Sequence, residues 1–144
     1  MKPTPSLLRI IQVDYLASLG AIFPFVSWGL AVVGRFFDPE ASSFFLQASP
    51  IVTVAGLVVI AWRGSTIRSV ISNGAETAGV ISGIGFFRGR GRVRYVYTYQ
   101  GQKYEGSSAI QSTKSTRTLT QGQEVTVMVD PFRPRRAFVR ELYL

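Results

Sequence analysis

Two long apolar stretches without a charged residue occupy most of the first 62 residues of this chain. They span residues 15–34 and 41–62. A helix rises about 1.5 Å per residue, so each stretch is long enough to cross a hydrocarbon core of about 30 Å. The sequence therefore predicts a two-helix membrane hairpin within residues 1–74.

The second predicted helix extends beyond its uncharged stretch. Ile67, Val70 and Ile71 continue an i, i+3, i+4 pattern, and the pair Asn73–Gly74 is a stop signal. We therefore expect helices over about residues 15–34 and 42–72.

Small residues, a proline and a tryptophan in the first stretch are candidates for contacts between helices. Small residues let helix backbones approach closely in lipid, and a proline frees a carbonyl that must find another partner. The pattern allows two interpretations: packing against the second helix of the hairpin, or packing against helices of a larger assembly. The candidates are Gly20, Ala21, Pro24, Trp28 and Gly29.

The net charge lies entirely after the apolar stretches. Residues 1–62 hold three basic and three acidic residues, whereas residues 63–144 hold 13 basic and five acidic residues, a net charge of +8. The expected loop between the helices has only Arg35, and the outer flanks carry Lys2, Arg9, Arg63 and Arg68. The positive-inside rule predicts a two-pass protein of the inner (plasma) membrane, with both termini and the basic domain in the cytoplasm.

From about residue 75 the apolar pattern changes from helical to alternating, as expected for strands. Turn signals such as Gln100–Gly101 separate the alternating segments. Residues 75–144 are thus predicted to form a small antiparallel all-β domain, a sandwich or a partly open barrel. The five expected strands cover residues 77–84, 92–99, 102–109, 124–129 and 137–142.

Three alternating tyrosines, Tyr95, Tyr97 and Tyr99, are expected on one face of the second strand. Alternating tyrosines more often cover a core, with their hydroxyls at its rim, than form an exposed stacking surface. We therefore assign them to the core.

The β segments carry an ordered set of Gly, Val, Tyr, Asp and Pro residues. These are Gly79, Val80, Val93, Tyr95, Tyr97, Gly101, Tyr104, Gly106, Gly122, Val125, Val127, Asp130, Pro131 and Pro134. With the preceding hairpin, this order resembles a widespread bacterial family of membrane-anchored domains of unknown function, with a Val-x-Tyr-x-Tyr strand and a final Tyr-Asp-Pro-x-x-Pro signature. Val129 stands where that family often has tyrosine. The resemblance implies the fold and implies no catalytic residue.

Four arginines alternate with glycine and valine at residues 88–94: Arg88, Arg90, Arg92 and Arg94. Alternate residues of a strand share a face, so the guanidinium groups can form one ribbon that attracts phosphate or carboxylate groups. Arg133, Arg135 and Arg136 are candidates to extend it. Anionic lipid headgroups, an acidic partner protein, nucleic acid and plain solvent are the alternatives for this patch.

The chain contains no histidine and no cysteine, which excludes metal sites built on those residues and histidine-based catalytic triads. Asp130, before Pro131, is expected to cap a turn. Asp14 is expected as an ordinary residue of the membrane boundary, with a pair with Arg9 or a polar contact as the alternatives. We therefore predict a non-catalytic protein without cofactor or metal.

The favoured function is that of an accessory or assembly subunit that contacts other integral membrane subunits or anionic lipids. No small-molecule substrate is expected. An independent lipid- or nucleic-acid-binding tether and a helper of a membrane enzyme remain as alternatives.

Overall fold

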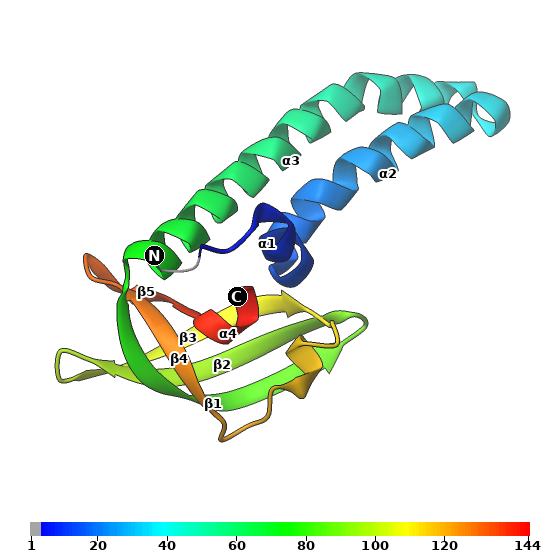
Figure 1. Ribbon diagram of the computed structural model, residues 1–144. Helices are drawn as coiled ribbons and strands as arrows, with labels where there is room; N and C mark the ends of the chain where they lie inside the picture. The colour runs from blue at the N-terminus through cyan, green and yellow to red at the C-terminus, as the bar shows by residue number, and fades with distance from the viewer. Residues whose placement is uncertain (1–3) are drawn as a thin grey trace.

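The computed structural model describes residues 4–144 as a long helical hairpin joined to a small β barrel (Figure 1). Lys2, which contributed to the predicted orientation, lies outside the described residues. The helices are α1 (Leu7–Val13), α2 (Tyr15–Phe37), α3 (Pro39–Asn73) and α4 (Arg140–Tyr143). The strands are β1 (Ala75–Phe87), β2 (Arg90–Tyr99), β3 (Gln102–Gln111), β4 (Glu124–Asp130) and β5 (Arg133–Val139), with a short 3-10 turn at Thr116–Thr118.

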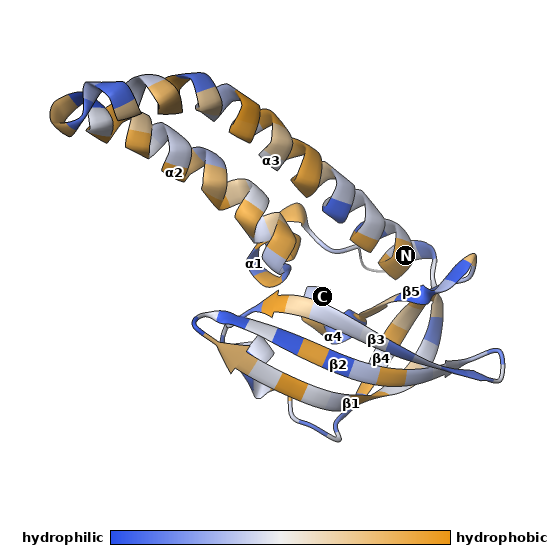
Figure 2. Ribbon diagram, turned by 180° about the vertical axis from the view of Figure 1, so that it is seen from behind, coloured by the Kyte–Doolittle hydropathy of each residue, from blue (hydrophilic) through white to orange (hydrophobic). Residues whose placement is uncertain are grey.

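Helices α2 and α3 are long and apolar enough to cross a membrane, as the two uncharged stretches predicted. Figure 2 shows apolar residues along both helices. Only Asp38 separates them: its side chain accepts a hydrogen bond from the Ala41 amide at 3.1 Å, and Pro39 occupies the first turn of α3, where its missing N–H costs nothing. The connection is therefore shorter than the predicted helix bounds of 34 and 42 implied, because α2 continues to Phe37 and α3 begins at Pro39.

The two helices approach each other closely at a pair of glycines. A methyl group on Gly56 would collide with the Gly20 carbonyl oxygen, and one on Gly20 would lie 2.9 Å from the Gly56 carbonyl oxygen. The Gly20 carbonyl is the group that Pro24 leaves without its helical partner, because proline has no N–H to donate. Gly20 and Pro24 thus serve the contact between α2 and α3.

Serine hydroxyls connect the helices further along the hairpin. Ser27 and Ser49 share a buried hydrogen bond of 2.6 Å, and the Ser42 hydroxyl donates to the Ala31 carbonyl oxygen at 2.7 Å. In an apolar environment these bonds satisfy groups that would otherwise be costly to bury. They fix the register of the two helices.

The strands form one antiparallel sheet in the order β3-β2-β1-β4-β5. β1 is the long central strand: its first half pairs with β4, and its second half continues along β2 past an irregularity between Ile81 and Gly83. Such irregularities bend a strand and increase its twist. The bend curls the sheet until its edge strands, β3 and β5, approach each other, and a nearly closed barrel results (Figure 1).

Two tyrosine hydroxyls bond across this barrel. Tyr95 donates to the Ala137 carbonyl oxygen and Tyr97 to the Pro134 carbonyl oxygen, both at 2.6 Å, so β2 is joined to β5. Tyr95 and Tyr97 are buried, as the alternating pattern predicted, and Tyr99 is half-buried beside the core. The two long side chains fill the interior that a five-stranded sheet encloses.

The end of the chain differs from the sequence-based expectation. A strand over residues 137–142 was predicted, but β5 ends at Val139 and α4 follows. Leu142 and Tyr143 are still buried in the core because α4 turns back toward α1 and β4. Neighbouring side chains of a strand point to opposite faces, so a helical turn is what lets Leu142 and Tyr143 both enter the core. The apolar pattern at the end of the chain is too short to reveal this period.

The hairpin and the barrel share one hydrophobic core. Ile10 and Val13 of α1, Ile67 and Ile71 of α3, and Val127 of β4 are all buried in it. α3 is about 50 Å long at 1.5 Å per residue, more than a bilayer core requires, and its last turns lie on the barrel (Figure 1). The barrel is therefore packed against the helices and does not hang from a flexible linker.

The glycine contact yields a test of the hairpin. We expect Gly56→Ala to lower the thermal stability of the detergent-solubilised chain, by about 1–3 kcal/mol, because the added methyl group must push the helices apart. Gly29→Ala is the matched control, since a methyl group on Gly29 meets nothing within 4 Å. Equal melting temperatures for the two variants would contradict this packing.

Burial of the tyrosines predicts a loss of stability in alkali. Desolvation raises the pKa of Tyr95 to about 12 and also raises the pKa of Tyr97, whereas an unfolded tyrosine ionises near pH 10, roughly. The folded protein therefore keeps the tyrosine protons at a pH at which the unfolded chain loses them. The free energy of unfolding has its full value below about pH 10 and decreases as the pH rises toward about 12. Thermal unfolding followed by circular dichroism between about pH 8 and 12 should show this fall, and Tyr95→Phe should make it shallower. An unchanged slope in Tyr95→Phe would refute the assignment.

Candidate functional site

The junction between the helices and the barrel is built around Asp14. This residue interrupts the helical run between α1 and α2, and its extended backbone forms an isolated antiparallel bridge with Ile110 of β3. Its side chain caps α2 by accepting a hydrogen bond from the Ala17 amide at 3.0 Å. With 1% of its surface exposed, Asp14 is the only buried carboxylate among residues 4–144.

The partner of Asp14 is Arg63 of α3. The Arg63 Nη2 group contacts Asp14 Oδ2, and Nε donates to Oδ1 at 3.2 Å, so the guanidinium binds the carboxylate with two parallel bonds. Asp14 is therefore not the ordinary boundary residue that the sequence predicted. The alternative pairing with Arg9 is not formed either, because Arg9 donates to the Ser115 hydroxyl at 3.3 Å. The ion pair joins the start of the first apolar span to the end of the second, because Asp14 precedes Tyr15 and Arg63 follows Trp62.

Aromatic rings surround this ion pair. The Arg63 guanidinium carbon lies 5.7 Å from the centre of the Phe138 ring and 5.9 Å from that of Trp62, within the range of cation–π attraction. Tyr143 is buried against Phe138, and burial raises the pKa of its phenol, an effect that the nearby Asp14 carboxylate strengthens. The cluster thus contains one ion pair in an aromatic shell, in which the Tyr143 hydroxyl is buried without a hydrogen-bond partner among residues 4–144. The ion pair suits a clamp, a structural contact that holds the two helices and the barrel together.

The predicted arginine ribbon forms in part. Arg88 and Gly89 are the turn between β1 and β2, with φ of 48° and 82°, and all four arginines are exposed. Arg90, Arg92 and Arg94 lie on the outer face of β2, since Val93, Tyr95 and Tyr97 between and beyond them face the core. Among residues 4–144, no carboxylate forms an ion pair with any of these four arginines.

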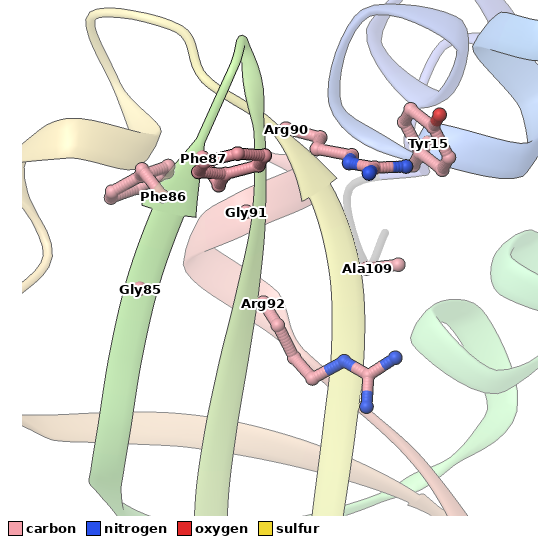
Figure 3. Close-up of a pocket in the computed structure, with 8 residues that line it drawn as sticks. All are labelled: Tyr15, Gly85, Phe86, Phe87, Arg90, Gly91, Arg92 and Ala109. Atoms are coloured by element: carbon pink, nitrogen blue, oxygen red, sulfur yellow. The ribbon is translucent and has the colours of Figure 1, made fainter.

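Glycines on β1 leave room beside the ribbon. Gly85 pairs with Arg92, and Gly83 pairs with Arg94. Without side chains at these positions, the outer face is hollowed, and the nearby hollow of about 420 Å³ is lined by Tyr15, Gly85, Phe86, Phe87, Arg90, Gly91, Arg92 and Ala109. Figure 3 shows that Arg90 extends toward the ring of Tyr15, whereas Phe86 lies on the β1 side. The Arg90 guanidinium carbon is 6.0 Å from the centre of the Tyr15 ring.

The second group of predicted arginines lies elsewhere. Arg133, Arg135 and Arg136 belong to β5, which pairs with β4 beside the beginning of β1, whereas Arg90 pairs with Phe87 at the end of β1. Measured along β1, Phe87, the partner of Arg90, is about 40 Å from Ala75, where β4 pairs, and Gly83, the partner of Arg94, is about 26 Å from it. Arg136 is also 3.9 Å from Asp130 in an ion pair. The structure does not bring the two groups into one patch.

The helix-packing candidates are divided between two surfaces. Gly20 and Pro24 lie inside the hairpin, and the Trp28 indole Nε1 donates to the Thr53 hydroxyl at 3.1 Å. Ala21 is half-buried. Gly29 is exposed with open space around it, so it is the candidate that remains available to another helix.

The remaining polar candidate is structural. Asp130 caps the β4–β5 turn, because its Oδ1 accepts a hydrogen bond from the Phe132 amide at 3.0 Å, as predicted. No group of three or more Asp or Glu side chains that could hold a metal ion occurs among residues 4–144.

Sequence reasoning missed the Asp14–Arg63 pair, although a signal existed. Each residue is the charge that bounds one end of an apolar stretch, and a hairpin places these ends side by side. The packing of the barrel against both helices, which removes the pair from water, was not visible in the sequence.

A family model described as "Domain of unknown function (DUF3592)" matches residues 65–142, from the last turns of α3 to α4. Searches of curated proteins and of solved structures found no match.

The ion pair predicts a charge-specific loss of stability. Asp14→Asn keeps a cap for α2 but leaves the Arg63 guanidinium without its carboxylate in a largely buried place, and we expect a cost of roughly 3 kcal/mol. Asp38→Asn is the matched control, because Asp38 caps α3 in the same way but is exposed. Thermal unfolding and hydrogen exchange in detergent should show a loosened junction for Asp14→Asn alone. Equal effects of both substitutions would contradict a clamp.

Proposed function

We propose that this chain, which belongs to the DUF3592 family of domains of unknown function, is a non-catalytic, membrane-anchored accessory subunit of a larger membrane protein complex. In this proposal α2 and α3 cross the membrane, and the barrel stands on the cytoplasmic side. The excess of basic residues after the second span supports this orientation, because positively charged flanks are retained in the cytoplasm.

The observation that carries the proposal is the outer surface of the hairpin. Large apolar side chains cover it, such as Phe25 with 80% exposure, and this surface requires lipid or other helices around it. Gly29 forms a gap in that surface, with exposed Val32 and Val33 one turn further along α2. A gap of this kind lets a neighbouring helix backbone approach, which is how small residues promote helix association in lipid.

The shared core supports a role in presenting the barrel. Helix α3 passes from the apolar span onto the barrel without a break, and the Asp14–Arg63 pair fixes α2 to the same place. A partner that binds the hairpin therefore meets the barrel at a fixed height and angle. This geometry suits an assembly subunit better than a tethered module on a flexible linker.

The distribution of titratable groups supports a non-catalytic role. Asp14, the only buried carboxylate among the described residues, is occupied by Arg63 and by the cap of α2. The arginine hollow is lined by no carboxylate from the described part of the chain. General acid–base chemistry needs several convergent titratable groups. Beside Asp14 the buried Tyr143 hydroxyl has no hydrogen-bond partner among residues 4–144, but burial raises its pKa and so opposes its ionisation.

Recovery of partners from native membranes tests the proposal. The tagged full chain, extracted in mild detergent, should bring a defined set of integral membrane subunits at a fixed ratio. Gly29→Leu should reduce that recovery at least several-fold, because it fills the gap on the outer surface, while the melting temperature of the chain stays unchanged. Leu30→Ala, a change at an adjacent exposed position, is the control.

Recovery of the chain without any partner would refute the accessory role. Equal recovery with Gly29→Leu would refute the contact at Gly29.

A further inference from the structure

We infer that the tip of the β1–β2 hairpin (residues 86–90) contacts the bilayer, with Phe87 in the membrane interface and Arg88 and Arg90 on the phosphates of anionic lipids. This rests on the proposed function only in that α2 and α3 cross the membrane. The ligand is the lipid surface itself, whatever subunits surround the hairpin.

The tip lies at the level where the first span begins. Arg90 reaches the ring of Tyr15, the first residue of α2, and Ile110, which pairs with the residue after Arg90, bridges to Asp14. Figure 1 shows this end of the β1–β2 hairpin beside the start of α2. Trp62 is at the same boundary, next to the arginine that binds Asp14. Tyrosine and tryptophan favour the interface between lipid and water, so the tip reaches that interface.

The two phenylalanines at the tip lie in different environments, one packed on the barrel and one exposed beside arginines. Phe86 packs over Gly91 at the end of the barrel, because a methyl group on Gly91 would collide with its ring. Phe87 points to the other face of β1, where it pairs with Arg90, and 62% of its surface is exposed. The Arg88 guanidinium carbon lies 5.2 Å from the centre of the Phe87 ring. A ring flanked by guanidinium groups suits the border between acyl chains and headgroups.

The hollow beside the tip matches a phosphate-bearing headgroup. Tyr15, Arg90 and Arg92 line it, and Gly85 leaves its floor free of a side chain (Figure 3). Arginine binds phosphate oxygens with paired hydrogen bonds, and no carboxylate within residues 4–144 forms an ion pair with these arginines. A lipid seated there would have its acyl chains beside the apolar surface of α2. An acidic soluble protein would satisfy the arginines but would leave Phe87 in the bilayer interface unexplained.

The opposite end of the barrel provides a matched control. Phe132, at the β4–β5 turn, is 93% exposed and is followed by Arg133, so it repeats the chemistry of a bare aromatic beside arginine. It lies near the end of α3, which is about 15 Å further along the helix than Arg63. The inference places Phe87 in the interface and Phe132 in water.

Tryptophan fluorescence of the full chain in vesicles tests this placement. Phe87→Trp and Phe132→Trp are each made in a chain carrying Trp28→Phe and Trp62→Phe, so that each protein has one indole probe. Both are reconstituted into phosphatidylcholine vesicles with or without phosphatidylglycerol, and acyl chains brominated near the headgroup serve as the quencher.

We expect the indole at position 87 to emit at shorter wavelength than the indole at position 132 and to lose intensity in brominated lipid. The indole at position 132 should be unaffected by the quencher. Replacing Arg88 and Arg90 by serine in the Phe87→Trp chain should remove the additional quenching produced by phosphatidylglycerol, because the phosphate contacts that hold the tip at the lipid are lost.

A chain that retains Trp28 as its only tryptophan tests the membrane anchor separately from the lipid contact of the tip. Trp28 lies within α2 and should be quenched by lipids brominated deeper in the acyl chain. If Trp28 is quenched and the Phe87→Trp probe behaves as the Phe132→Trp probe does, the hairpin spans the bilayer and the inference about the tip is wrong. If Trp28 is not quenched, the membrane anchor of the proposed function fails. Quenching of the Phe87→Trp probe without any effect of phosphatidylglycerol or of the arginines would overturn the assignment of phosphate binding.

Discussion

The clamp between Asp14 and Arg63 determines how the rest of this molecule is arranged. It combines a backbone bridge from Asp14 to β3, a cap on α2 and a two-bond ion pair to α3 at a single place. Removal of one partner of such a pair leaves the other charge buried without compensation. This destabilises a protein far more than replacement of both partners by apolar residues does. The shell of Trp62, Phe138 and Tyr143 therefore makes the pair specific for one docking geometry.

That geometry gives the two arginine groups of the barrel different surroundings. Arg90, which pairs with the end of β1, lies beside Tyr15 at the start of α2, whereas the arginines of β5 lie near the end of α3. If the barrel were joined by a flexible linker, both groups would reach the same surfaces. Because the core is continuous from α3 to β4, a membrane around the hairpin would meet only the first group.

The small residues of α2 show a similar division. Gly20 and Pro24 are used within the hairpin, where the carbonyl freed by the proline meets the backbone of Gly56. Gly29 faces outward. Two glycines of the same helix thus differ in role: Gly20 stabilises the hairpin, whereas Gly29 remains available to the helix of another protein. The difference depends on the rotation of α2 relative to α3, which the serine hydrogen bonds at Ser27 and Ser42 set.

The sequence by itself determined most of the elements of this protein, with the end of the chain as the exception. Uncharged length predicted two apolar helices, the alternation of Val93, Tyr95 and Tyr97 predicted a core strand, and Gln100–Gly101 predicted a turn, because each signal depends on residues close together in the chain. Only the tertiary structure decided which partner Asp14 takes, that the chain ends in α4, and that the two arginine groups are far apart. Those outcomes depend on contacts between residues that are dozens of positions apart in the chain. Barrel closure and the core shared by helices and barrel bring these residues together, and a local sequence pattern does not encode such contacts.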